Sequence, residues 1–302
     1  NDMFDKNNTC KTRVTLGGSF VSKYQDLEEI MANDTAMLTL PANVASWAAR
    51  LNVNHGGFSI DGEFANKQND PSSINNFIYK NGQSLLVQAS YSQKGFGIIA
   101  SAKRTDNMSY KSKRTETGNA LDINYLPALP RQHAYSLSAM YPYATQPNGE
   151  MALAGQINYK IKKDSWVGGK YGTDIAVNYS RITSIKMEPA EGENTTGASG
   201  TLGYQSPFFA FGDELYFQDL NIEIQHKFTS SYKLLVSYMY LNYNIDVIEG
   251  HPGDPMVKAH IIIADMTYKF NQTNALKFEF QNLFTKQDDG DWLQFLFEYT
   301  IA

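Results

Sequence analysis

Apolar and polar residues alternate one by one in segments of about ten residues along nearly the whole chain. In residues 151–161 the odd positions are apolar or small, and the even positions are small, polar or charged. The same pattern follows Asn274, where Leu276 and Phe278 alternate with a lysine and a glutamate. Side chains alternate across a β-strand, so each segment predicts a strand with one apolar and one polar face.

The alternation predicts an all-β protein with about fourteen strands. The expected strands cover residues 11–22, 43–55, 58–67, 83–92, 96–104, 119–126, 132–143, 150–161, 173–183, 214–228, 233–244, 257–270, 275–285 and 292–301. A sheet of this size must cover its apolar face with a second sheet, with helices or with lipid.

The connections between the expected strands alternate between short turns and long loops. Two connections depart from the pattern, because 144–149 is short in a long position and 162–172 is long in a short position. Segregation of loops by length is typical of an outer-membrane barrel, with turns on the periplasmic side and loops outside. We therefore expect an antiparallel transmembrane β-barrel, and an even strand number places both termini in the periplasm.

The two faces of the expected strands differ in chemical character. The apolar face includes Leu16, Phe64, Leu137 and Phe280. A charged side chain facing hydrocarbon costs about 2–4 kcal/mol, so the polar face must line the lumen. The lumen-lining candidates for solute binding are Arg50, Asp61, Glu63, Lys103, Asp122, Lys160, Asp174, Glu223, Asp265, Lys269, Lys277 and Glu279.

Aromatic residues gather near the ends of the expected strands, where the girdles of a membrane barrel lie. The set is Tyr24, Trp47, Tyr91, Phe96, Tyr141, Tyr143, Tyr171, Tyr232, Tyr268, Phe270, Trp292 and Tyr299. Tyrosine is also favoured in strands generally, so the gathering supports the barrel without proving it.

Composition narrows the range of functions. The 302 residues carry a net charge of −5 without a basic block, so no nucleic-acid partner is expected. Cys10 is the one cysteine of the chain and cannot form an internal disulfide. We expect residues 1–302 to form one barrel domain, either complete or part of a larger barrel.

Candidate chemistry is sparse. The five histidines show no metal-ligand spacing, and no serine, histidine and acid trio suggests a hydrolase. The acidic loop 288–291 has oxygen ligands for calcium, although charged loop tips are usually only solvated. We expect no catalytic residue, no metal site and no cofactor, and hence no enzyme.

Several motifs resemble an uncharacterised outer-membrane barrel family of the Bacteroidota. They are Trp47-Ala48-Ala49-Arg50, His55-Gly56-Gly57-Phe58, the segments 124–133 and 141–150, and Gly168-Gly169-Lys170-Tyr171-Gly172-Thr173. The resemblance covers about half of the chain and implies a barrel in the outer membrane. It implies no activity and no catalytic residue.

Two functions remain open for a barrel with a polar lumen. The first is a porin-like channel or transporter for small solutes, and the alternative is a non-conducting structural or accessory subunit of a larger outer-membrane complex. Expected partners are outer-membrane lipid and lipopolysaccharide, with other outer-membrane or periplasmic proteins in the alternative. A soluble β-sandwich is a third possibility.

Overall fold

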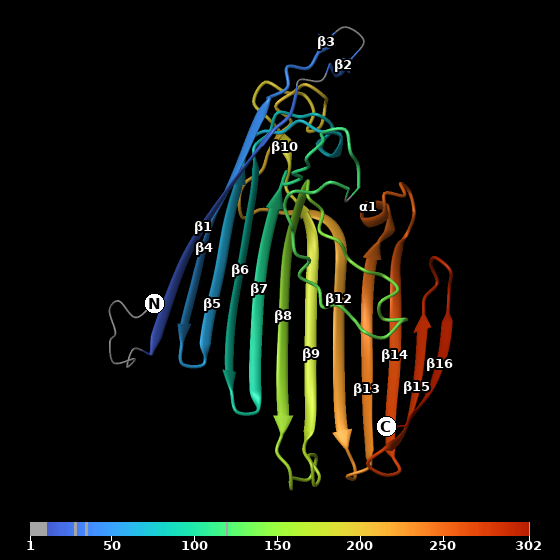
Figure 1. Ribbon diagram of the computed structural model, residues 1–302. Helices are drawn as coiled ribbons and strands as arrows, with labels where there is room; N and C mark the ends of the chain where they lie inside the picture. The colour runs from blue at the N-terminus through green and yellow to red at the C-terminus, as the bar shows by residue number, and fades with distance from the viewer. Residues whose placement is uncertain (1–10, 27–28, 34–35, 119, 302) are drawn as a thin grey trace.

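The computed structural model describes residues 11–26, 29–33, 36–118 and 120–301 (Figure 1). Twelve long strands form one sheet in which each strand pairs with its neighbour along the chain, always antiparallel. These strands are β1 Thr12–Tyr24, β4 Asn43–His55, β5 Phe58–Lys67, β6 Gly82–Gln93, β7 Phe96–Asp106, β8 Gly149–Ile161, β9 Thr173–Ile185, β12 Phe211–Lys227, β13 Tyr232–Asn244, β14 Met256–Lys269, β15 Asn274–Phe284 and β16 Trp292–Ile301.

The remaining regular elements are small and lie in the connections. They are β2 Met31–Asn33, β3 Ala36–Met37, the 3₁₀-helix η1 Ser73–Asn75, β10 Glu188–Pro189, β11 Tyr204–Gln205 and α1 Ile245–Glu249. Among the described residues, no helix has the length and apolar character needed to cross a membrane.

Short and long connections lie at opposite ends of the sheet (Figure 1). The end with 56–57, 94–95, 162–172, 228–231 and 270–273 is called the turn end, and the opposite end is called the loop end. β1 begins and β16 ends at the turn end. The alternation of loop length expected from the sequence is therefore present, and the long 162–172 connection is an exception to it, as the sequence indicated.

The all-β antiparallel fold class predicted from the sequence is confirmed, but two expected strands are wrong. Residues 120–126 and 132–143 of these expected strands lie in the connection between β7 and β8, residue 119 lies outside the described residues, and twelve strands instead of fourteen form the sheet. Within the second segment the Ala139 amide donates to the Tyr135 carbonyl at 2.9 Å. Residues four apart therefore share a side, and Leu137 and Tyr141 are both buried.

The two faces of the sheet follow from the strand register. Arg50 is opposite Glu63, and Glu63 is opposite Leu86, so these side chains share one face. The β7–β8 connection packs against this face, which is called the inner face. The opposite outer face exposes large apolar side chains, such as Leu16 at 77% and Phe297 at 70%.

Aromatic side chains form a row on the outer face near the turn end. Ring pairs in this row include Phe58–Tyr91 at 4.4 Å, Phe228–Tyr232 at 5.2 Å and Tyr268–Phe270 at 5.1 Å. Three members of the expected girdles lie elsewhere. Tyr141 and Tyr143 belong to the β7–β8 connection on the inner side, and Trp292 is opposite Leu283 of the inner face.

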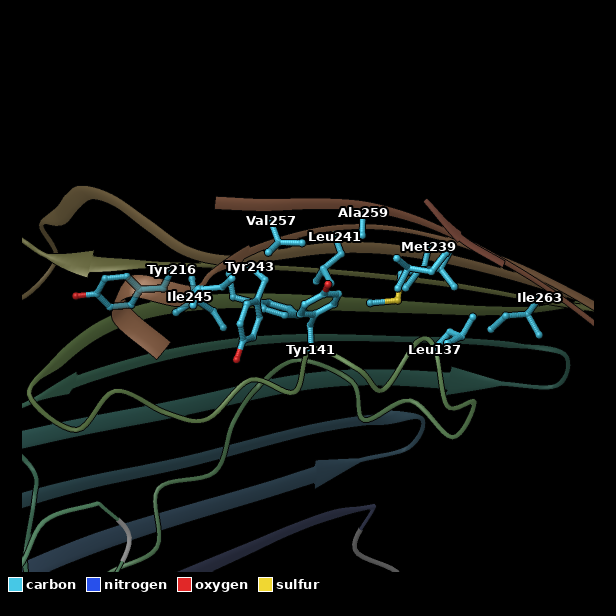
Figure 2. Close-up of a cluster of buried hydrophobic side chains, with 14 of the residues drawn as sticks. Leu137, Tyr141, Tyr216, Met239, Leu241, Tyr243, Ile245, Val257, Ala259 and Ile263 are labelled. Carbon is cyan, nitrogen blue, oxygen red and sulfur yellow. The ribbon is translucent and has the colours of Figure 1, made fainter. Parts of the chain in front are cut away.

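The inner face is polar over the first strands and apolar near the loop end of the later ones. Met239, Leu241, Val257, Ile261 and Ile263 of β13 and β14 are all buried at 2% exposure or less. Figure 2 shows Leu137 and Tyr141 of the β7–β8 connection facing this cluster. The core of the protein therefore lies on the inner side of the curved wall, and the expected polar face has an apolar part near the loop end of the later strands.

Candidate functional site: the inner face and the segment across it

The connection between β7 and β8, residues 107–148, is called the inner segment. It contacts strands at both edges of the sheet. The Lys23 ammonium of β1 donates to the Lys111 carbonyl at 2.7 Å, and the Ser136 hydroxyl donates to Gln294 of β16 at 2.8 Å. The inner segment therefore crosses the inner face of the whole sheet.

Polar contacts attach the middle of the inner segment to the later strands. Arg131 forms an ion pair with Glu223 at 2.9 Å, and His133 Nε2 is 3.5 Å from Asp219 Oδ2. The Tyr135 hydroxyl donates to Asp265 at 2.9 Å. Burial, and then the hydrogen bond to Asp265, raise the pKa of Tyr135, so this hydroxyl remains a donor.

Apolar contacts fix the same stretch. Leu137 and Tyr141 join the buried cluster of β8, β9 and β12–β15. The Leu137 amide donates to the Gln281 side chain at 2.9 Å, so its backbone polar group is satisfied where the side chain is buried. The Tyr141 ring lies 5.3 Å from that of Tyr243, and its hydroxyl donates to Asp288 at 3.0 Å.

A fully buried ion pair between β7 and β8 contacts the middle and the C-terminal end of the inner segment. Lys103 Nζ is 2.7 Å from Glu150 Oε1, with side-chain exposures of 1% and 0%. Lys103 also donates to the Pro127 carbonyl at 2.5 Å and to the Thr145 hydroxyl at 2.6 Å. Glu150 accepts from the Tyr143 hydroxyl, and burial followed by this carboxylate raises the pKa of Tyr143.

A second buried charged cluster lies at the loop end. Asp70 accepts from Lys23 at 2.6 Å and from Arg114 of the inner segment at 3.1 Å. Lys67 donates to the Ser109 carbonyl at 2.5 Å. The beginning of the inner segment is therefore tied to β1, β5 and the connection after β5.

Hollows remain between the inner segment and the wall formed by β1, β4–β9 and β12. A hollow of about 320 Å³ lies among Ser19, Glu63, Lys103, Tyr110 and their neighbours. Another, of about 170 Å³, is lined by Gln88, Ser101, Arg131, Ala154 and Asp219 among others. An open depression of about 420 Å³ on β1, β4, β5 and β6 is lined by Arg50 and Asp61 among others.

The twelve charged candidates from the sequence divide between the sheet and the inner segment. Eleven lie on sheet strands, and the register gives all eleven the same face, which is the inner one. Asp122 is not on a strand, since it lies in the inner segment and pairs with Lys111 at 2.5 Å.

Most of these candidates neutralise one another. Arg50 pairs with Glu63 at 3.2 Å, Lys160 with Asp174 at 2.8 Å, and Lys277 with Glu279 at 2.9 Å. Lys277 is also 3.4 Å from Asp265. Asp61 accepts from Asn52, and Lys269 lies near the turn end of the same face. The inner wall is consequently polar without a strong excess of one charge.

Sequence reasoning missed Arg131, His133, Tyr135 and Glu150, which attach the inner segment. The available signal was proline, because Pro127, Pro130 and Pro147 flank the two wrongly expected strands and Pro142 lies within the second. Proline has no N–H to donate to a sheet ladder, so such spacing argues against interior strands.

No group of three or more histidine, cysteine or acidic side chains within the described ranges has the arrangement of a metal site. In the acidic loop 288–291, Asp288 accepts from Tyr141 and Asp291 accepts from the Thr285 amide at 3.0 Å. These two carboxylates serve to attach the loop to its neighbours. Cys10 lies outside the described residues.

The comparisons with known proteins give one family and several solved structures. A family of unknown function, DUF6029, matches residues 1–302. No curated protein matches the chain. A mutant of the ferric enterobactin receptor PfeA from Pseudomonas aeruginosa has a TM-score of 0.46 and 11% identity, over 97% of this chain and 42% of that chain.

Two further solved structures have lower TM-scores. The siderophore receptor PirA from Pseudomonas aeruginosa has a TM-score of 0.36 and 9% identity, over 86% of this chain and 47% of that chain. OccAB4 from Acinetobacter baumannii has a TM-score of 0.37 and 12% identity, over 97% of this chain and 72% of that chain. The chain thus spans less than half of either receptor, and TM-scores below 0.5 carry no inference about its function.

Proposed function

This chain belongs to the DUF6029 family, and from that premise we propose that it is an outer-membrane β-barrel protein that passes small solutes along its polar inner wall. The observation that carries the proposal is the division of the inner face. The apolar part is covered by the inner segment, whereas hollows remain beside the polar part on β1 and β4–β9.

The outer face supports a location in lipid. Its exposed side chains are apolar along the strands, and its aromatic row lies where a membrane interface would be. Water would penalise such a surface, since large contiguous apolar patches are rare on soluble monomers. If the turn end lies in the periplasm, β1 begins and β16 ends on the periplasmic side, as in bacterial barrels.

The barrel must be closed for this location. Among the described residues, β1 and β16 each pair on one side only. An unpaired backbone group in hydrocarbon costs several kcal/mol, so lipid does not tolerate a free sheet edge. We infer that β1 and β16 are paired in the membrane, with each other or with further strands of a larger barrel.

A conductance measurement tests the transport proposal. The protein reconstituted in a planar lipid bilayer should conduct ions, and Ala154→Trp should reduce that conductance because Ala154 lines a hollow beside Arg131. Leu153→Trp is the matched control, since Leu153 is the neighbouring outer-face residue and is 44% exposed. Absence of conductance in the unmodified protein, or equal effects of both variants, contradicts the proposal.

A second candidate is a non-conducting structural or accessory subunit of an outer-membrane complex, without enzymatic activity. It is favoured by the attachment of the inner segment to both edge strands, because a segment fixed in this way would obstruct the lumen. This function predicts no conductance together with purification of a constant partner in mild detergent.

A further inference from the structure

The connection 162–172 is unlike the other turns at the turn end. It has eleven residues, whereas the four other connections there have two to four. The Trp166 side chain at its tip is 99% exposed, and the next residue, Val167, is 52% exposed. An exposed tryptophan beside an exposed valine has no packing role within the chain.

The turn holds a defined shape. The Asp164 amide donates to the Gly169 carbonyl at 2.6 Å, and the Gly169 amide donates to the Ser165 carbonyl at 2.9 Å. A Cβ at Gly168 would lie 2.0 Å from the Lys162 carbonyl oxygen, so only glycine fits there. The exposed pair is therefore presented by a hydrogen-bonded turn.

Two contacts place the turn on the outer side of the sheet. Thr173 and His226 are opposite each other on β9 and β12, and the alternation from Asp174 and Gln225 puts them on the outer face. The Thr173 hydroxyl donates to the Val167 carbonyl at 2.9 Å. A Cβ at Gly169 would lie 3.2 Å from the His226 ring.

The aromatic row continues directly from this point. The His226 ring is 4.5 Å from that of Phe228, which stacks with Tyr232 at 5.2 Å. Trp166 and Val167 are thus contiguous with the apolar outer face that the proposed function places in lipid.

The charge of the turn is opposite to that of the protein. The turn carries three exposed lysines, Lys162, Lys163 and Lys170, and one acidic residue, Asp164, while the whole chain has a net charge of −5. Tryptophan prefers the headgroup level of a bilayer, and lysine attracts anionic headgroups. The exposed groups of this turn match a phospholipid surface in both respects.

We propose that the 162–172 turn is a lipid anchor that inserts Trp166 among phospholipid headgroups and holds anionic lipid with its lysines. This inference rests on the proposed membrane location. It assigns the long turn a role in fixing the depth of the barrel at the periplasmic leaflet, which the transport proposal does not require.

Fluorescence of single-tryptophan variants tests the anchor in the full chain. The chain has three tryptophans, Trp47, Trp166 and Trp292. Trp47→Phe with Trp292→Phe leaves Trp166 as the reporter, and Trp166→Phe with Trp292→Phe leaves Trp47, which lies on the outer face of β4. Each variant is reconstituted in phosphatidylcholine vesicles with or without phosphatidylglycerol, containing lipids brominated at shallow or deep positions.

The anchor predicts that Trp166 is quenched more by shallow than by deep bromines and that its emission shifts to shorter wavelength when phosphatidylglycerol is present. Lys162→Gln, Lys163→Gln and Lys170→Gln together should abolish the phosphatidylglycerol effect and leave Trp47 quenching unchanged. Heat-modifiable migration on a gel confirms that each variant is folded.

Two outcomes overturn the anchor and one overturns its premise. If Trp47 is quenched by bromolipid but Trp166 behaves as in water, the anchor is wrong and the barrel location stands. If Trp166 is shielded only in native membranes and not in vesicles, a protein partner covers the turn and the anchor is wrong. If Trp47 is not quenched either, the proposed membrane location fails.

Discussion

At the scale of single residues, the most consequential contact is the buried pair of Lys103 and Glu150. Both side chains are almost fully buried, and together they contact Pro127, Thr145 and the Gln146 amide of the inner segment. A buried pair gains little over an apolar pair of the same shape, but loss of one partner leaves a charge without solvation. The pair therefore fixes the position of the C-terminal end of the inner segment against β7 and β8.

Glu150→Leu should destabilise the protein by about 3–5 kcal/mol because the Lys103 ammonium stays buried without its partner. The temperature at which the band of folded protein disappears from a gel measures the effect. The double variant Lys103→Met with Glu150→Leu should recover part of the lost stability. Asp174→Leu is the control, because its pair with Lys160 is about half exposed and should matter little. Equal losses in the two single variants would show that burial does not decide the effect.

Buried tyrosines make the stability of the folded protein depend on pH in the alkaline range. Burial and a nearby carboxylate raise the pKa of Tyr143 and the pKa of Tyr204, so the folded protein keeps protons that the unfolded chain releases near pH 10. Their contribution to stability is complete below about pH 10 and is lost as the pH rises through the folded pKa. Tyrosinate absorbance should therefore rise later in folded than in denatured protein, and coincident titration curves would contradict this.

At the scale of elements, the inner segment shows what the sequence could and could not predict. Twelve strands and the alternation of their connections were predictable, because an apolar face and a polar face impose a period of two on every strand of the sheet. Residues such as Leu121 and Ile123 imitate that period over a few positions. The sequence alone cannot show that such a stretch packs inside the wall, because that depends on the apolar inner face of β13 and β14.

Leu137→Ala should loosen the inner segment, since a buried leucine truncated to alanine costs about 2–5 kcal/mol and leaves a cavity under the segment. Trypsin cleavage after Arg131 measures the loosening and should become faster in the folded protein. Leu121→Ala is the matched control in the same segment, because Leu121 is 53% exposed. If both variants are cleaved at the rate of the unmodified protein, Leu137 does not anchor the segment.

At the scale of the whole molecule, the two edge strands, β1 and β16, limit most strongly how the sheet can be arranged. β16 has the sequence Trp292-Leu-Gln-Phe-Leu-Phe-Glu-Tyr-Thr-Ile301, without proline or lysine. Exposed edges in soluble proteins are usually protected by such residues. The alternation of β1 and β16 is the same as that of interior strands, as the proposed closed wall with lipid on one side requires.

Hydrogen exchange of the reconstituted protein tests this pairing. If β1 and β16 are paired in the membrane, their amides should exchange as slowly as those of β6, which is paired on both sides. The connection 245–255 at the loop end is the fast-exchanging reference. In a sheet with free edges, every second amide of β1 and β16 would instead exchange rapidly, because those N–H groups point away from their one partner strand. Rapid exchange at these positions would mean that the twelve strands do not form part of a closed wall, and the transport proposal would lose its lumen.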